Sequence, residues 1–167
     1  MSKTRIRPAT PDDAATVVRL VKALAVYEKE PESVVEMTEE SFLAHGFGER
    51  PYFECLLAEL DGEAVGLALF FHNYSTWAAK PGIYLEDLFV EERARGHGLG
   101  RALLEALASV AQARDCGRLD LSVLDWNPTR DFYDRIGMKH MAEWLTYRLD
   151  RAGIATLAAN LKEGDKT

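Results

Sequence analysis

The 167-residue sequence lacks several features that would indicate particular classes of protein. It has only two cysteines, Cys55 and Cys116, and their spacing suits neither a disulfide nor a zinc site, so we expect reduced thiols and no metal. No apolar run approaches the roughly 18 residues that a membrane span needs. The N-terminus from Met1 to Arg5 begins no signal-peptide core. We therefore expect a cytoplasmic protein with no membrane partner.

Positive charge is also scarce, because 20 Lys and Arg stand against 27 Asp and Glu, giving a net charge of -7. A nucleic-acid partner would need a basic face, so none is expected. The acidity is concentrated between Glu28 and Glu63, where eleven acidic residues face only Lys29 and Arg50. This segment is either a solvated helical face or a surface that attracts a cationic substrate.

Repeats and low-complexity segments are absent as well, and the length suits one domain over residues 1–167. The residue patterns predict an α/β (α+β) fold with a mixed sheet, antiparallel at first and parallel where two strands flank the longest helix. Asp61-Gly62 is a strong hairpin signal between the second and third strands. The expected strands are 4–7, 53–60, 64–71, 83–90, 119–124 and 141–149. The expected helices are about 11–28, 38–48, 98–114, 126–137 and 153–161. Residues 72–80 are expected to form a loop.

A glycine-rich turn lies between the predicted strand 83–90 and the predicted helix 98–114. Its glycines at 96, 98 and 100 let a ligand approach the backbone, and the first-turn amides of the helix favour an anion such as phosphate. Arg95 and Arg101 flank this turn. It is not a P-loop, because the lysine and hydroxyl are missing, and no dinucleotide GxGxxG can be drawn through it. A plain loop with solvated arginines is the alternative.

This turn resembles the pyrophosphate motif Gln/Arg-x-x-Gly-x-Gly/Ala of the GCN5-related N-acetyltransferases (GNAT), matched by Arg95, Gly98 and Gly100. The resemblance covers about residues 4–150, leaving 151–167 as a tail. Further matching stretches are similar to the spermidine/spermine (diamine) and thialysine acetyltransferase branch. They are Ile6 to Thr10, Leu24 to Glu28, Met37 to Glu40, Gly46 to Gly48, Tyr84 to Val90 and Trp126-Asn127.

The resemblance implies that acetyl-coenzyme A binds in a V-shaped opening between the two central parallel strands, which a bulge near Leu88 splays apart. Backbone groups of Leu88, Phe89 and Val90 would pair with the pantetheine amides, and Asn127 would touch the pantetheine arm. The branch also implies a homodimer. The pyrophosphate would lie on the amides of Gly96, His97, Gly98, Leu99, Gly100 and Arg101.

Acetyl transfer to an amine needs a base, because an alkylammonium has a pKa near ~10.4. Glu86 matches the family's position for this base, and Asp87 can share the charge of a cationic acceptor; alternatively, both are solvated acids. Tyr133 matches the general acid that protonates the leaving thiolate, although Phe132 and Tyr133 could be core aromatics.

The acceptor would meet Tyr27 and Glu28, with Glu143 and Trp144 contributing from the last predicted strand. One departure is that five residues separate Asn127 from Tyr133, where the family has six. The predicted function is an acetyl-coenzyme A-dependent N-acetyltransferase acting on a polyamine, diamine or thialysine-like amino acid. A protein N-terminal or lysine acetyltransferase and a non-catalytic coenzyme A-binding module are the alternatives.

Overall fold

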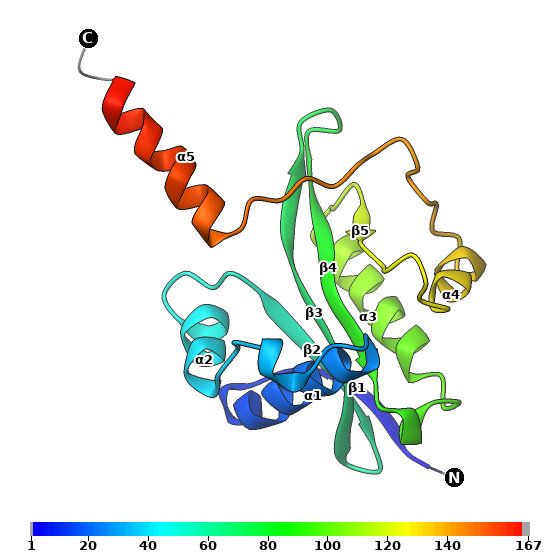
Figure 1. Ribbon diagram of the computed structural model, residues 1–167. Helices are drawn as coiled ribbons and strands as arrows, with labels where there is room; N and C mark the ends of the chain where they lie inside the picture. Colours follow the sequence, from blue (N-terminus) through cyan, green and yellow to red (C-terminus); the bar gives the residue numbers. More distant parts are fainter. Residues whose placement is uncertain (1, 165–167) are drawn as a thin grey trace. The chain divides into compact units, whose positions relative to one another are not determined.

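The structure is a computed structural model that describes residues 2–164 (Figure 1). The chain divides after Asn127 into two compact units. The first contains the sheet and the longest helix, α3 (Leu99–Ala113). The second, from Pro128 onward, contains two helices joined by irregular chain.

The first unit is built on a five-stranded sheet in the order β1-β2-β3-β4-β5. Neighbouring strands are antiparallel from β1 to β4, whereas β4 and β5 are parallel, which confirms the predicted mixed sheet. The hairpin turn at Asp61-Gly62 is also confirmed, and both residues have positive φ angles, 51° and 89°. The strands are β1 (Thr4–Pro8), β2 (Glu54–Leu60), β3 (Glu63–Ser75), β4 (Lys80–Val90) and β5 (Leu119–Leu121).

Helices of the first unit begin where the sequence supplies capping residues. The Thr38 hydroxyl accepts a hydrogen bond from the Ser41 amide at 3.1 Å, and the Ser41 hydroxyl accepts one from the Thr38 amide at 2.9 Å. This pair fixes the start of α2, as the sequence predicts. The helices are η1 (Pro11–Asp13), α1 (Ala14–Tyr27), η2 (Glu32–Val34), α2 (Glu39–Phe47), η3 (Glu92–Ala94) and α3 (Leu99–Ala113).

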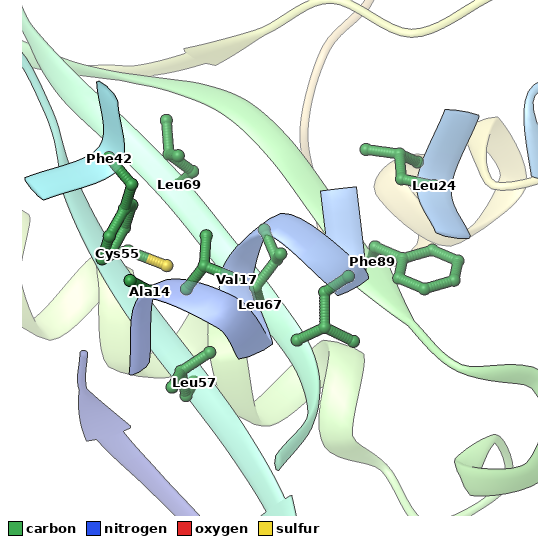
Figure 2. Close-up of a cluster of buried hydrophobic side chains, with 10 residues drawn as sticks. Ala14, Val17, Leu24, Phe42, Cys55, Leu57, Leu67, Leu69 and Phe89 are labelled. Carbon is green, nitrogen blue, oxygen red and sulfur yellow. The ribbon is translucent and has the colours of Figure 1, made fainter. Parts of the chain in front are cut away.

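The main hydrophobic core lies between α1 and one face of the sheet (Figure 2). The buried α1 side chains recur at the spacing of one helical face, and Phe42 of α2 extends the cluster. This core therefore fixes the end of α1 beside the C-terminal half of β4. Its members are Ala14, Val17, Leu20, Leu24, Phe42, Cys55, Leu57, Leu67, Leu69 and Phe89.

Alternate strand residues point to the other face, where α3 packs. Phe70 and Leu85 are paired across β3 and β4 and are each 2% exposed. The apolar side of α3 is buried too, through Leu99, Leu103, Leu104 and Leu107. The sheet is thus covered on both faces, and α3 begins immediately after the glycine turn.

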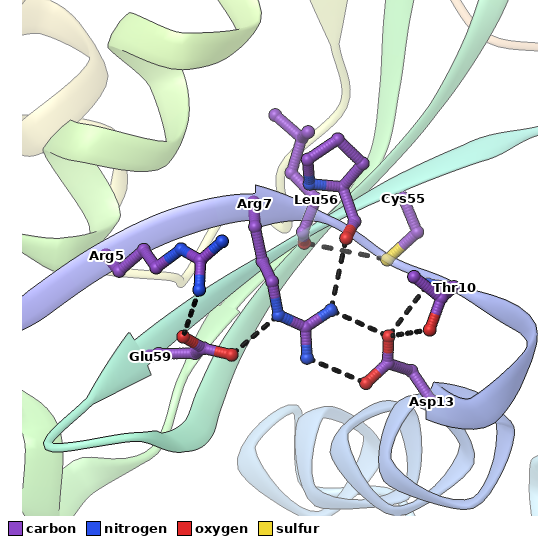
Figure 3. A network of polar contacts seen from close by, with 8 residues as sticks. Arg5, Arg7, Thr10, Asp13, Cys55, Leu56 and Glu59 are labelled. Carbon is purple, nitrogen blue, oxygen red and sulfur yellow. Dashed lines mark hydrogen bonds and ion pairs between the residues drawn. The ribbon is translucent and has the colours of Figure 1, made fainter.

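A charged network joins the first strand to the start of the helical layer (Figure 3). The Arg7 guanidinium donates to both Asp13 oxygens at 2.7 and 2.8 Å and to Glu59 at 2.6 Å. The Thr10 amide also donates to Asp13 at 2.7 Å. The Arg7 guanidinium holds the pKa of the Asp13 carboxyl far below its usual value, because these bonds favour the ionised form.

The predicted loop at 72–80 is wrong in extent, because β3 and β4 continue through most of it. His72 Nδ1 lies 2.9 Å from the Gly82 carbonyl, and the Asn73 amide donates to Asp120 at 3.1 Å. Polar side chains that suggested a loop therefore find partners inside the sheet. Only residues 76–79 remain between the two strands.

The second unit contains α4 (Arg130–Arg135) and α5 (Arg151–Gly164). α4 is shorter than the predicted helix, and Gly137, with a φ of 91°, follows its end as expected. The predicted strand 141–149 is wrong: among residues 2–164 the sheet has five strands, and none lies in this segment. Its weak alternation was insufficient, because a strand also needs neighbouring backbone partners. Residues 165–167 of the predicted tail lie outside the described residues.

Candidate active site

The two parallel strands separate at the centre of the sheet. β4 pairs with β5 only through Ile83–Leu119, Tyr84–Asp120 and Leu85–Leu121. β4 then continues to Val90, still paired with β3 on its other side. The outward backbone groups of its last five residues therefore lack a β5 partner, and this matches the opening that the family resemblance implies.

A β-bulge interrupts β4 at Glu86. Phe70 of β3 pairs with Leu85, the preceding Leu69 pairs with Asp87, and Glu86 has no counterpart. The irregularity thus lies two residues before Leu88, the position suggested by the resemblance. Because Leu69 and Phe70 point to opposite faces, so do Asp87 and Leu85. The bulge turns the Asp87 side chain toward the face covered by α1.

The turn after β4 has the backbone needed to bind an anion. Gly96 and Gly98 have φ angles of 83° and 73°, and Gly98 is the N-cap of α3. A Cβ at either position would meet nothing within 4 Å, so glycine is favoured by the backbone angle rather than by space. No side chain among the described residues caps this end, and first-turn amides lack intrahelical acceptors. These amides can receive a phosphate.

The side chains around the turn have different roles from its backbone. Leu99 is 2% exposed and packs in the core, so only its amide can face a ligand. His97 Nδ1 lies 3.2 Å from the carbonyls of Ala94 and Arg95. The exposed Arg101 guanidinium donates to Glu105 at 2.8 Å.

Tyr27 connects the end of α1 to the predicted cofactor residues. Its hydroxyl donates to the buried Asn127 at 3.3 Å, and its ring lies 6.2 Å from the Phe89 ring. The Arg95 guanidinium lies 4.7 Å from the Tyr27 ring centroid, and its Nε donates to the Val90 carbonyl at 3.2 Å. A predicted acceptor residue thus touches three predicted cofactor residues.

A second contact between the same segments was missed by sequence reasoning. The Lys29 ammonium lies 3.9 Å from the ring centroid of Trp126, next to Asn127. Lys29 has a φ of 67°, which is uncommon for a residue other than glycine. The only sequence signal was the match at Trp126-Asn127, which did not indicate a partner.

Three carboxyl groups meet where α1 ends beside β4. Burial, and then the charges of Glu86 and Glu28, raise the pKa of Asp87 from an ordinary 3.8 to about 6. Burial also raises the pKa of Glu28. Glu86 is exposed. Among the described residues no lysine or arginine forms an ion pair with any of the three, so this is an uncompensated acidic site.

The remaining predicted residues lie in the second unit. Tyr133 is half-buried on α4, with its ring centroid 5.5 Å from that of Phe132. Glu143 and Trp144 lie in the irregular segment after α4, and both are exposed. Their roles stay predictions.

Comparisons with known proteins identify the family of this chain. The model of the acetyltransferase (GNAT) family matches residues 18–138. A thialysine N-epsilon-acetyltransferase of Mus musculus is 36% identical over 95% of this chain and 99% of its own. A spermidine/spermine N(1)-acetyltransferase-like protein 1 of Homo sapiens is 30% identical over 95% of this chain and 24% of its own.

Among solved structures, an integron cassette protein from V. cholerae has a TM-score of 0.77 and 26% identity, covering 93% of this chain and 97% of its own. The fold of this chain is thus shared with that structure. The chain belongs to the acetyltransferase (GNAT) family. Within that family it is an N-acetyltransferase of the diamine/thialysine branch.

No helix within residues 2–164 is both long and apolar enough to span a membrane. Cys55 offers little for catalysis. Burial, followed by the Asp87 charge, raises the pKa of the Cys55 thiol to about 12, so this thiol stays protonated near neutral pH.

Proposed function

We propose that this protein transfers the acetyl group of acetyl-coenzyme A to a primary amine of a small cationic acceptor, such as a polyamine, diamine or thialysine-like amino acid. The observation that carries the proposal is the path of β4. It leaves β5 after Leu85, passes a site with three carboxyl groups and ends at a glycine turn with open helix amides.

The first unit offers groups that fit acetyl-coenzyme A along its length. The unpaired backbone of β4 from Leu88 to Val90 suits the pantetheine amides, as in the addition of a short strand. The amides from Gly96 to Arg101 suit the pyrophosphate. The resemblance places Asn127, which is buried and accepts a hydrogen bond from Tyr27, at the pantetheine arm.

The charge near the end of α1 favours a cationic acceptor. Between Glu28 and Glu40 the chain has six glutamates and one lysine, and that Lys29 is held over Trp126. None of these glutamates forms an ion pair within the described residues, in contrast to Glu54, Glu59 and Glu63, which pair with arginines. Unneutralised carboxylates raise the local concentration of a cation. The names of the relatives, which include thialysine and spermidine/spermine, support the same class.

The chemistry assigned to the residues follows from the thioester donor. A carboxylate of β4 removes a proton from the ammonium, and the resemblance gives this role to Glu86. The neutral nitrogen attacks the thioester carbonyl, so a C–N bond forms and the C–S bond breaks. The nitrogen loses its second proton, and Tyr133 donates one to the departing sulfur. The products are an N-acetyl amine, free coenzyme A and one released proton.

A free-thiol release assay with acetyl-coenzyme A tests the proposal. The acceptors are a set of polyamines, diamines, lysine analogues and peptides. We expect acceptor-dependent thiol with the small dications and little with the peptides. Release with peptides alone would favour a protein acetyltransferase. No acceptor-dependent thiol with any amine would contradict the proposed activity.

Tyr133 can be tested separately from cofactor binding. We expect Tyr133→Phe to lose most of the turnover and to bind acetyl-coenzyme A as tightly as the parent protein, measured by calorimetry. Tyr147→Phe is the matched control, because Tyr147 lies in the same unit and is 90% exposed. Unaltered turnover in Tyr133→Phe would remove the general-acid assignment.

The resemblance further supports one acetyltransferase domain over the whole chain and a homodimer. Light scattering coupled to gel filtration measures the assembly, and a mass of about one chain, 18.7 kDa, would contradict the dimer.

A further inference from the structure

We propose that Asp87, rather than Glu86, is the group that takes the proton from the acceptor ammonium. This assignment rests on the proposed function, because it concerns the base of that reaction. It begins from the β4 bulge, which gives the two neighbouring carboxylates different surroundings. Glu86 is the unpaired residue of the bulge, and Asp87 is the first residue to regain a partner in β3.

The register places Asp87 on the acceptor side of the sheet. Cys55, Leu69 and Asp87 form one row across β2, β3 and β4, and the first two belong to the core beneath α1. Phe89, two residues further along β4, belongs to that core as well and contacts Tyr27. Asp87 therefore lies on the face that carries the end of α1, where Tyr27 and Glu28 are found.

The groups that act on Asp87 all favour its protonated form. The causes are burial and the charges of two carboxylates, Glu86 from β4 and Glu28 from the end of α1. The Cys55 thiol of β2, whose own pKa the Asp87 charge helps to raise, is neutral and offers no positive charge. No lysine or arginine forms an ion pair with Asp87 among residues 2–164. The raised pKa of Asp87, about 6, agrees with this geometry and suits a base near neutral pH. The ammonium group of a bound acceptor would then place a positive charge next to this carboxylate.

Glu86 then acts through its charge. Because it is exposed and adjacent in sequence, its carboxylate raises the affinity of Asp87 for a proton. In the proposed step the Asp87 carboxylate gains the ammonium proton, and the nitrogen lone pair becomes free to attack the carbonyl carbon. The carboxylic acid so formed returns its proton to water after the product leaves, and no further reactant is needed.

The test is the pH dependence of kcat/KM for the parent protein, Asp87→Asn and Glu86→Gln, with circular dichroism and cofactor affinity as folding controls. We expect Asp87→Asn to lose about 100-fold or more near pH 7 and to lack the acid-side inflection. Glu86→Gln should keep that inflection and shift it to lower pH, because Asp87 has lost a neighbouring negative charge.

A weakly basic acceptor sharpens the same test. An amine with a pKa near 8 is partly neutral in solution, so it should recover much of the rate of Asp87→Asn and comparatively little of any loss in Glu86→Gln. Loss of the inflection in Glu86→Gln, with its retention in Asp87→Asn, would overturn the assignment and leave the proposed function intact. Failure of the parent protein to release thiol with any amine would overturn both.

Discussion

Two carboxylates, the buried Asp13 and the half-buried Asp87, both act on the Cys55 thiol, yet their own pKa values move in opposite directions. Asp13 is held by a bidentate arginine and by the Thr10 amide, and its pKa falls. Asp87 has two carboxyl groups as neighbours and no arginine, and its pKa rises. Burial is common to both sites, so the difference comes from the partners.

The comparison separates a charge that stabilises the fold from one that costs stability. The Asp13 network ties β1 and β2 to the start of α1, and every charge in it has a partner. The Asp87 site leaves negative charge uncompensated in a partly buried place. Such an arrangement persists where a cation is meant to bind, because an arriving ligand supplies the missing partner.

The largest change in the free energy of unfolding should come from removing Arg7, the arginine of the Asp13 network. We expect Arg7→Met to lower the free energy of unfolding by about 3 kcal/mol, because it leaves Asp13 with only its Thr10 donors and Glu59 with only the Arg5 guanidinium at 4.0 Å. Denaturant titration at pH 7 measures this change. The parent should lose the contribution of Asp13 as the pH falls below about 4, since its native pKa is depressed, and Arg7→Met should show a smaller loss there. Equal stability of the two proteins would contradict a stabilising role for the network.

At the Asp87 site, removing the charge is expected to raise the free energy of unfolding rather than lower it. The native pKa of Asp87 is raised above its unfolded value, so its ionisation destabilises the fold increasingly as the pH rises from about 4 through 6. Asp87→Asn should therefore increase the free energy of unfolding at pH 8 by up to about 3 kcal/mol. The gain should disappear near pH 4, where the parent carboxyl is protonated. A gain that is the same at both pH values would show that charge is not its cause.

A smaller change should follow from removing one neighbour of Asp87. We expect Glu28→Gln to lower the pKa of Asp87 by less than about one pH unit, because burial, the larger cause, remains. Carbon NMR of the Asp87 carboxyl through a pH titration measures it. Glu30→Gln is the control, since Glu30 is exposed and does not contribute to the shift. An unmoved Asp87 pKa in Glu28→Gln would show that the two carboxyls do not interact.

The smallest effect is expected at an exposed ion pair. The Arg93 guanidinium donates to Glu63 at 3.0 Å, but both side chains are more than half exposed. We expect Glu63→Gln to leave the midpoint of thermal unfolding within experimental error, because water screens this pair. A large fall would show that pairing with arginine, rather than burial, determines the stability of the Asp13 network.

Much of the fold could be predicted from local sequence patterns. The Asp61-Gly62 turn, the Thr38 cap and the apolar face of α3 depend on residues close together in the chain, and they were correct. The extension of β3 and β4 through part of 72–80 was missed because His72 and Asn73 bond to Gly82 and Asp120, contacts that a local pattern does not show. The strand expected at 141–149 failed because alternation cannot supply a neighbouring strand.

In the candidate site, too, features set by local sequence could be predicted, and features set by strand pairing could not. The glycine turn could be predicted because the positive φ angles at positions 96 and 98 favour glycine, and glycines can be read directly from the sequence. The different environments of Glu86 and Asp87 were invisible, because in β4 the residues at 83, 85, 87 and 89 alternate as if they shared one face. Only the pairing with β3 reveals the extra residue between them.

That extra residue also determines how β4 would tolerate a change in length. Deleting Glu86 would make the pairing with β3 continuous, and Asp87 and Phe89 would keep their partners Leu69 and Leu67 and their place on the α1 face. Deleting the paired Leu88 would instead bring Phe89 opposite Ala68 and move its side chain out of the core beneath α1. The end of β4 should therefore tolerate a one-residue deletion at the bulge better than at a paired position, where the deletion would turn the following side chains to the opposite face.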